Sequence, residues 1–453
     1  MSLIKPRIPS GTLELLPRNQ MVFQHMLDVI RRGYERFGFV QVETPVFEHK
    51  DILLTKSGGE TEKQVYFVQS TGSLAQGYEP DMALHFDLTV PLARYVAMRE
   101  RELAFPFRRY QIQRSYRGER PQKGRAREFY QCDIDVIGKD KLDPSYDAEL
   151  PAIIVEIFTE LGLKEFTIHF SNRKILLGLL QAWGVADFET QTLIVREIDK
   201  LDKIGIEKVR ESVLELGLAP EATDKLLALI VLRGTKEEVL EALRALKVET
   251  LAFVEGVHEL EVMVSSLRAL GVPEERTRIN LAIARGLDYY TGTVYETLLD
   301  KYPEIGSICS GGRYDNLASM YCKSKLPGVG LSIGATRLYE LLESLNMLPP
   351  VPHTTRVLIA QQDESLGREY LSLAAMLRKS GLTVENYLEP SKLDKQLKYA
   401  DKAGIPYIVI YGVEEKARGT VLLKDMASKQ QSEVKVAELA DVIKGLTPPS
   451  VLN

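Results

Sequence analysis

The sequence is poor in cysteine and histidine. Its three cysteines, Cys132, Cys309 and Cys322, are odd in number and show no C-x-x-C spacing. This disfavours a disulfide-rich scaffold and is typical of a reducing compartment. The six histidines are scattered, with no H-x-x-x-H motif and no Cys/His cluster. Because structural zinc sites are built from such clusters, we expect no metal held by protein ligands alone.

Long hydrophobic runs are also absent. The longest purely apolar run, Leu226 to Leu232, is far shorter than the ~20 residues of a membrane-spanning helix. The opening residues 1–17 contain no apolar signal core. We therefore expect a cytoplasmic protein with no membrane partner.

Positive charge is not in excess either. The 453 residues carry a net charge of -5, so a nucleic-acid partner has to be held by local basic patches and not by the whole surface. The hydrophobic content of 45% is enough for two or three packed domains.

The patterns along the first part of the chain, residues 1–173, mix helices and strands. Apolar periodicity and alternation predict, in order, a helix at 21–37, an extended segment at 39–48 interrupted by Pro45, a hairpin at 108–137 and a helix at 147–162 with Pro151 in its first turn.

Three further stretches follow. Residues 174–275 are rich in Leu, Ala, Glu and Lys at helical spacing, which predicts an inserted helical module. Residues 276–348 return to strands, with a glycine-rich turn at 310–316 and a strand that leads into a helix. After a proline-rich boundary, residues 355–453 alternate strand and helix, which predicts an α/β domain with a largely parallel sheet.

The predicted hairpin carries an unusual set of side chains. Residues 108–127 contain eight Arg or Lys and a single acid, Glu119. Since strand side chains alternate between faces, one face of the hairpin gathers polar groups with a single aromatic ring. That face suits a ligand with phosphates, an aromatic base and a small polar group, although a solvated charged hairpin remains the simpler alternative. Its members are Gln111, Gln113, Ser115, Arg117, Phe129, Gln131 and Asp135.

Two other segments combine arginine with unusual neighbours. In the first, Arg285 follows an apolar strand and precedes the paired Tyr289 and Tyr290; a hairpin with packing tyrosines would explain it equally well. In the second, a strand turns into a helix and Arg337 falls in the first helical turn. A cation there opposes the helix dipole but would suit a bound phosphate, with a solvated surface arginine as the alternative.

These segments together resemble the class II aminoacyl-tRNA synthetases. FGFVQVETPVF resembles the first class II motif, YRGERPQKGRAREFYQCDIDVIG the second, and GVGLSIGATRLYELLE the third. ARGLDYYTGTVYE and SGGRYDNL resemble the histidine-specific signatures of histidyl-tRNA synthetases, and HFDLTVPLARYVA resembles their amino-acid-binding strand. The C-terminal RVLIA and KQLKYADKAGIPYIVIYG resemble their anticodon-binding domain. The resemblance runs from about Pro9 to Lys444.

The resemblance implies an α+β fold with two domains and one insertion. An antiparallel catalytic sheet flanked by helices would be formed by residues 1–173 and 276–348. The helical insertion, 174–275, would contact tRNA, and residues 355–453 would form the anticodon-binding α/β domain. The proline of the first motif, here Pro45, lies at a dimer interface in this family, which implies a homodimer.

The resemblance also implies roles for individual residues. Arg117 and Arg337 would hold the ATP phosphates, Glu119 and Arg125 would complete the nucleotide pocket, and Phe129 would stack on adenine. For histidine, the implied ligands are Asp87 and Thr89 with Leu88 between them, and Gln131, around the α-amino group, and Asp135, Tyr289 and Tyr290 around the imidazole. Arg117 and Arg285 would be catalytic, with Arg285 reaching the carboxylate and the α-phosphate.

The implied reaction joins L-histidine to tRNA(His) through a histidyl-adenylate made from ATP. Mg²⁺ would arrive with ATP. Gln122, in the basic loop at 118–126, would meet the acceptor end of the tRNA.

The sequence departs from the family pattern at four positions, none of which is a residue assigned above. Thr336 stands where glutamate is usual, Ser10 and Glu14 alter the opening pattern, and Asn316 replaces a common glycine. Three alternatives remain: a regulatory subunit of ATP phosphoribosyltransferase, a tRNA-sensing module of a kinase, and a class II synthetase for another amino acid.

Overall fold

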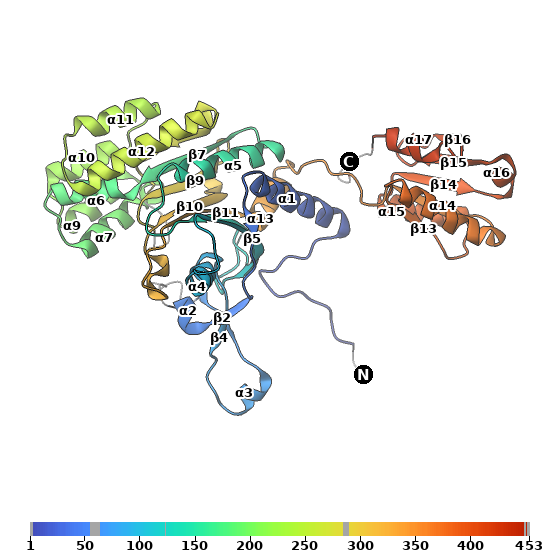
Figure 1. Ribbon diagram of the computed structural model, residues 1–453, viewed down its shortest axis with the longest axis horizontal. Helices are drawn as coiled ribbons and strands as arrows, with labels where there is room; N and C mark the ends of the chain where they lie inside the picture. The colour runs from blue at the N-terminus through green and yellow to red at the C-terminus, as the bar shows by residue number, and fades with distance from the viewer. Residues whose placement is uncertain (1–2, 55–63, 123, 284–289, 448–449, 451–453) are drawn as a thin grey trace. The chain divides into compact units, whose positions relative to one another are not determined.

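The computed structural model describes residues 3–54, 64–122, 124–283, 290–447 and 450 (Figure 1). The chain forms two compact units, one made of Met1–Leu13 and Leu27–Met347 and the other of Glu14–Met26 and Leu348–Asn453. Within the described residues, no helix is both long and apolar enough to cross a membrane.

The first unit is built on a sheet of eight strands. Its central strands pair antiparallel, as predicted, whereas the outermost strand at each edge pairs parallel to its neighbour, which was not predicted. In spatial order the strands are β1 (Val40–Gln41), β5 (Phe107–Tyr116), β6 (Glu128–Ile137), β11 (Gly328–Gly334), β10 (Cys309–Tyr314), β9 (Thr293–Leu299), β7 (Phe166–Asn172) and β8 (Thr277–Ile279).

The predicted hairpin is formed by β5 and β6. Arg109 pairs with Asp135 and Gln113 with Gln131 along the two strands. Paired residues of an antiparallel ladder point to the same face, so the polar residues of both strands gather on one side of the sheet. Several of them are buried, among them Arg109 and Asp135.

The predicted glycine-rich turn at 310–316 is wrong for most of its length, because β10 occupies Cys309–Tyr314. The glycines there permit close packing of strands. A Cβ atom on Gly311 would lie 2.1 Å from the carbonyl oxygen of Gly330, and one on Gly330 would lie 2.1 Å from Asp135 Oδ1. Because glycine has no side chain, Gly311 lets β10 and β11 approach closely, and Gly330 leaves room for the carboxylate of Asp135.

Two other local predictions are corrected. The segment 39–48 is not one strand: β1 joins the large sheet, and β2 (Phe47–His49) joins a separate sheet of three strands with β4 (Met82–Leu84) and β3 (Phe67–Val68). Pro45 lies between β1 and β2, and a proline has no N–H for a ladder. Pro151 is in the second turn of α5 (Tyr146–Glu160), not in the first.

Helices cover the sheet and supply its core. The buried Phe158 of α5 packs edge-on against Phe166 of β7, with ring centroids 5.3 Å apart. The C-terminal half of α1 is tied to the sheet by Tyr34, whose hydroxyl donates to the Cys132 carbonyl at 2.8 Å. The other helices of this part are α1 (Pro17–Arg36), α2 (Lys50–Leu54), α3 (Thr71–Ala75), α4 (Thr89–Arg99) and α13 (Ala335–Ser344), with short 3₁₀ helices η2 (Glu274–Arg276), η3 (Pro303–Ile305) and η4 (Leu317–Met320).

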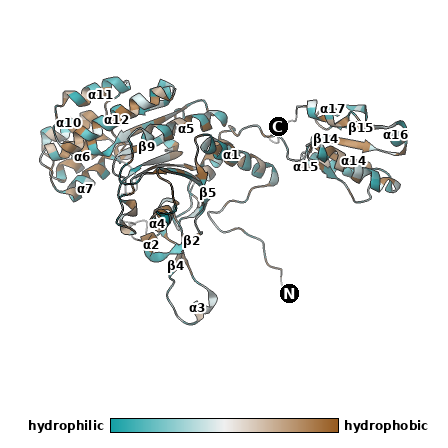
Figure 2. Cartoon of the chain, in the orientation of Figure 1, coloured by the Kyte–Doolittle hydropathy of each residue, from teal (hydrophilic) through white to brown (hydrophobic). Residues whose placement is uncertain are grey.

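The segment predicted as an inserted helical module folds into helices between Arg173 and Ala269, which lie beside β7 (Figure 1). Hydrophobic and hydrophilic residues alternate along its helices (Figure 2). Apolar side chains between Leu176 and Ile230, including Leu180, Ile198 and Leu226, form a core of their own. The helices are α6 (Arg173–Ala182), α7 (Phe188–Ile198), α8 (Leu201–Ile204), α9 (Ile206–Glu215), α10 (Pro220–Ile230), α11 (Lys236–Ala245) and α12 (Leu251–Ala269).

The second unit is an α/β domain with a mixed sheet of five strands. The first three strands are parallel, as predicted, but the last two, β15 and β16, add antiparallel to the edge. In spatial order the strands are β13 (Val384–Asn386), β12 (Val357–Gln361), β14 (Tyr407–Tyr411), β15 (Thr420–Asp425) and β16 (Gln431–Lys435). The helices are η5 (Glu364–Leu366), α14 (Gly367–Lys379), α15 (Leu393–Ala403), α16 (Val413–Arg418) and α17 (Leu439–Gly445).

Candidate active site

A cavity of about 360 Å³ opens beside β6, β10 and β11. Residues that the sequence did not single out, including Gln64, Ser307, Ser332 and Glu340, contribute to its wall. The predicted residues that line it are Arg117, Glu119, Arg125, Phe129, Gln131 and Arg337.

Arg117 and Phe129 are in contact at the loop end of the hairpin, where β5 ends and β6 begins. The guanidinium carbon of Arg117 lies 5.0 Å from the centroid of the Phe129 ring, which is a cation–π contact. Arg117 Nε also donates to the carbonyl oxygen of Phe86 at 3.1 Å. These contacts fix the position of the guanidinium in the cavity wall.

The loop between β5 and β6 folds back on itself. Gln122 and Arg125 exchange backbone hydrogen bonds of 3.1 and 2.8 Å around Gly124, which has a φ of +74° that favours glycine. Arg125 then pairs with Glu119 at 3.2 Å. Gln122 is exposed and does not line the cavity. The loop therefore presents Arg125 to the cavity and Gln122 to its outer side.

Arg337 occupies the first turn of α13, as predicted. A Cβ atom on Gly124 would lie 3.4 Å from Arg337 Nε, so the hairpin loop passes directly beside this arginine. Arg337 also donates to the carbonyl oxygen of Ile305. The neighbouring Thr336 accepts a hydrogen bond from the backbone N–H of Tyr130 at 2.8 Å and so ties α13 to β6.

Asp87, Leu88 and Thr89 lie where α4 begins. Asp87 is buried, and its Oδ1 accepts a hydrogen bond from the backbone N–H of Val90 at 3.1 Å. Burial raises the pKa of Asp87 to about 6, against the lowering effect of that hydrogen bond and of Arg117. None of these three residues lines the cavity itself, but Asp87 interacts electrostatically with Arg117, which does.

Asp135 is held by two groups that the sequence did not single out. Arg109 Nη2 lies 2.7 Å from Asp135 Oδ2, and the hydroxyl of Tyr314 donates to Asp135 Oδ1 at 2.7 Å. Burial raises the pKa of Asp135 to about 7, although Arg109 lowers it. The same Arg109 Nη2 donates to the carbonyl oxygen of Leu88 at 3.3 Å. Arg109 therefore joins the two segments expected to bind the amino acid.

A signal for Arg109 was present in the sequence, since strand alternation places it on the same face as Gln111 and Asp135. Tyr314 had no such signal, because it lies in a strand that was predicted as a turn.

The histidine-specific segment is described only in part. Arg285 and Tyr289 lie outside the described residues. Tyr290 lies against β10, where a Cβ atom on Gly312 would be 2.9 Å from its Cδ1 atom. It packs against the same apolar cluster as Tyr314, the phenol that contacts Asp135. The structure thus brings Tyr290 into the same cluster as the residue that holds Asp135.

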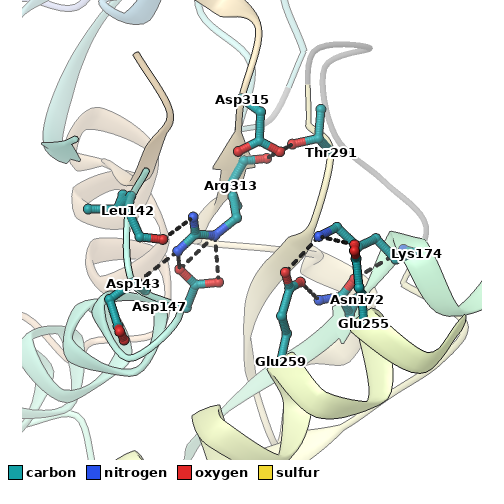
Figure 3. A network of polar contacts seen from close by, with 10 residues as sticks. All are labelled: Leu142, Asp143, Asp147, Asn172, Lys174, Glu255, Glu259, Thr291, Arg313 and Asp315. Carbon is teal, nitrogen blue, oxygen red and sulfur yellow. Dashed lines mark hydrogen bonds and ion pairs between the residues drawn. The ribbon is translucent and has the colours of Figure 1, made fainter. Parts of the chain in front are cut away.

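A network of buried polar contacts fixes the residues after this segment (Figure 3). The Thr291 hydroxyl donates to Asp315 at 2.5 Å, and its backbone N–H donates to the Arg313 carbonyl oxygen at 2.8 Å. Arg313 in turn makes a buried ion pair of 2.6 Å with Asp147 of α5. The network therefore anchors one end of the histidine-specific segment to the core.

Comparison with known proteins identifies the family. A family model described as histidyl-tRNA synthetase matches residues 11–338, and one described as anticodon binding domain matches residues 354–446. The chain belongs to the histidyl-tRNA synthetase family. The resemblance stated from the sequence is thereby confirmed, together with the class II fold and the character of a histidine-specific ligase.

Relatives match over nearly the whole chain. Histidine–tRNA ligases from Xanthomonas campestris pv. campestris (strain ATCC 33913) and Stenotrophomonas maltophilia are each 53% identical, over 98% of this chain and 96% and 98% of theirs. The crystal structure of histidyl-tRNA synthetase from Nostoc sp. PCC 7120 has a TM-score of 0.89 at 40% identity, covering 98% of this chain and 99% of that one. The anticodon binding domain favours a ligase of this family over its regulatory paralogue.

Proposed function

We propose that this chain is a histidine–tRNA ligase that uses ATP to join L-histidine to tRNA(His) in the cavity of the first unit. The observation that carries the proposal is the convergence of the two sets of predicted residues. The candidate nucleotide ligands line one cavity, and Gln131 in its wall belongs to the same strand as Asp135.

The nucleotide would lie along the cavity wall formed by the hairpin and α13. Phe129 offers an aromatic face to adenine, and Arg117 and Arg337 offer fixed positive charge to the phosphates. Mg²⁺ would accompany ATP, and Glu119 and Glu340 in the same wall provide the carboxylate oxygens that this ion takes beside phosphates. Burial raises the pKa of Glu340. A bound Mg²⁺ would act in the opposite direction, because a nearby cation favours the charged form of a carboxylate.

In the first step, a carboxylate oxygen of histidine attacks the α-phosphorus of ATP and pyrophosphate leaves. Negative charge grows on the nonbridging oxygens, and fixed guanidinium groups in a cavity stabilise it without reorganising. Arg117 would fulfil this role, and the family resemblance assigns Arg285 to it as well. In the second step, a hydroxyl of the terminal ribose attacks the carbonyl carbon of the adenylate and AMP leaves.

Specificity for histidine would arise at the buried end of the site. A neutral imidazole has one donor and one acceptor. Asp135, held by Arg109 and Tyr314, presents an oriented carboxylate to the donor, and Tyr290 presents a phenol to the acceptor. A site that hydrogen-bonds its substrate in this way discriminates against analogues that lack the hydrogen-bonding groups by a factor of roughly 10⁴ to 10⁵ in kcat/KM.

The protein would act as a cytoplasmic homodimer. Support for the dimer comes from Pro45 in the first motif and from its surroundings, because the large apolar side chains of Val40, Phe47 and Phe67 are about half exposed. The tRNA would contact the exposed Gln122 with its acceptor end and the second unit with its anticodon.

Aminoacylation with a tRNA(His) transcript tests this proposal. We expect radiolabelled histidine to become acid-precipitable with ATP, tRNA(His) and the protein together, and not with a transcript for another amino acid. Charging of another amino acid at a comparable rate, or no charging at all, would refute it.

A further inference from the structure

Buried acceptor atoms without donors mark a small part of the site. Asp87 Oδ2, Gln131 Oε1 and Asp133 Oδ1 have no hydrogen-bond partner among the described residues. Asp87 and Asp133 are each only 3% exposed, so water does not satisfy them from the surface. Because buried polar atoms in folded proteins almost always have a partner, these atoms indicate a ligand that supplies donors.

These atoms lie close to one another and to the cavity. Gln131 lines the cavity and donates through Nε2 to the Ser332 hydroxyl at 3.1 Å. Ser332 also lines the cavity and is the strand partner of Asp133 in β11. The charge of Asp133 raises the pKa of Asp87, which places the two carboxylates within electrostatic reach. Asp133 therefore lies beside a residue of the cavity wall and within electrostatic reach of Asp87.

Asp133 differs from its neighbour Asp135 in one respect. Both oxygens of Asp135 have donors, from Arg109 and Tyr314. Asp133 Oδ1 has no donor among the described residues. The charge of Arg109 and a hydrogen bond from Ser332 nevertheless lower the pKa of Asp133 against the raising effect of burial. Asp135 is thus a carboxylate held in place, and Asp133 is a carboxylate with an open acceptor.

Charge points to the same ligand. The described groups that interact around Asp133 are the carboxylates of Asp87, Asp133 and Asp135 and the guanidinium groups of Arg109 and Arg117. When all five groups are charged, three carboxylates and two guanidinium groups leave one negative charge in excess. A primary ammonium group brings one positive charge and three N–H donors, which match the three open acceptors.

We propose that Asp133 accepts a hydrogen bond from the α-ammonium group of the amino-acid substrate, beside Asp87 and Gln131, and thereby selects for a free amine. The inference rests on the proposed function, because it takes that substrate to be histidine. The rival interpretation is that Asp133 only balances the charge of Arg109. Under the rival interpretation, removing its charge weakens every ligand of the pocket alike.

Two competitive inhibitors of histidine-dependent ATP–pyrophosphate exchange separate these interpretations. Histidinol keeps the ammonium group and lacks the carboxylate, whereas imidazolepropionate keeps the imidazole and the carboxylate and lacks the ammonium group. In Asp133→Asn we expect KM for histidine and the inhibition constant of histidinol to rise together by at least about tenfold, since the amide oxygen can still accept a hydrogen bond but no longer carries the negative charge that strengthens a bond from an ammonium group. The inhibition constant of imidazolepropionate and KM for ATP should stay within about twofold.

Control variants keep the test decisive. Asp140→Asn removes an exposed carboxylate at a left-handed position that asparagine tolerates, and it should change none of these constants. If Asp133→Asn does not fold, the smaller Asp133→Ser takes its place with the same expectation. Equal rises for both inhibitors, or a rise for neither, would overturn the proposal.

Failure of the proposed function would be recognised separately. If the wild type shows no exchange with histidine, that function is refuted. Calorimetry would then measure the dissociation constants of histidinol and imidazolepropionate for wild type and variant. A rise of at least about tenfold for histidinol alone supports the role of Asp133, and equal changes for both compounds contradict it.

Discussion

Among the described residues of the first unit are two buried arginine–aspartate pairs, and they differ in how completely they are bonded. Arg313 donates from Nε and Nη2 to Asp147, and from Nη1 and Nη2 to the carbonyl oxygens of Leu142 and Asp143 (Figure 3). Arg109 pairs with Asp135 at 2.7 Å, but its other contacts are 3.3 and 3.4 Å long and its Nε has no partner among the described residues.

The difference separates a scaffold contact from a binding site. A buried ion pair stabilises a fold only when nearly all its donors and acceptors are satisfied. The Arg313 pair meets that condition and ties β10 to α5. The Arg109 pair lies within electrostatic reach of Asp87 and Asp133, two buried carboxylates that each have an oxygen without a donor among the described residues, and this arrangement favours a ligand which completes it. We therefore expect mutations to separate the two pairs into stability and substrate effects.

The largest effect should come from Arg313→Met. It removes the Arg313 donors from buried Asp147 and from the carbonyl oxygens of Leu142 and Asp143, which costs about 3–5 kcal/mol of unfolding free energy. Chemical denaturation of wild type and variant measures this loss. Arg244→Met is the control, since Arg244 makes an exposed ion pair of 2.7 Å with Glu261 and should cost less than about 1 kcal/mol. A loss for Arg313→Met no larger than the control would remove the distinction.

The next effect should come from Arg109→Met, which breaks the second pair. The pKa of Asp135 is already raised to about 7, so this carboxyl can take a proton instead of remaining an unpaired charge. We expect a smaller loss of stability than for Arg313→Met, but a rise in KM for histidine of about 30-fold or more, or roughly 2 kcal/mol. Steady-state exchange kinetics would show KM for ATP within about twofold of wild type. Parallel rises in both KM values would argue for general damage to the fold.

A third effect concerns pH. Because the folded-state pKa of Asp135 lies above its ordinary value, the folded protein binds this proton more tightly than the unfolded chain does. The resulting stability is present in acid and is lost as the pH rises through about 7, with a slope of up to about 1.4 kcal/mol per pH unit. Asp135→Asn should remove this contribution, so the difference between wild type and variant should change between pH 5 and 8. A difference in unfolding free energy that does not vary with pH would contradict the environment described for Asp135.

The smallest effect should come from Gln122→Ala, outside both pairs. Gln122 is exposed at the loop tip, so its loss should leave histidine activation unchanged. Transfer to tRNA should fall by about tenfold, or roughly 1.4 kcal/mol. Comparing pyrophosphate exchange with single-turnover transfer separates the two steps. An equal fall in both, or no fall in transfer, would remove Gln122 from the tRNA contact.

Local pattern predicted the hairpin and some of the residues that line the cavity, whereas Glu119 and Arg125 were assigned to it only by the family resemblance. Alternation along β5 and β6 placed Phe129, Gln131 and Asp135 on one face, and the charge pattern suggested a nucleotide. It did not predict the partners of Asp135. Tyr314 reaches that carboxylate from a strand rich in glycine, a composition that usually signals a turn and here permits close packing.

Other parts of the prediction depended on contacts between distant residues. Arg313 pairs with Asp147 at 2.6 Å across 166 positions of the chain, and no local pattern encodes such a contact. The same holds for the open acceptors of Asp87 and Asp133, which are evident only once the surrounding bonds are known. The roles of Arg285 and Tyr289 stay predictions, since both residues lie outside the described part of the chain.

The most direct test of the central claim is ATP–pyrophosphate exchange with the purified wild-type protein and each standard amino acid in turn. We predict exchange with histidine and none above background with the others, because we propose that Asp135 and Tyr290 select an imidazole. Exchange with a different amino acid, or with none, would contradict this account.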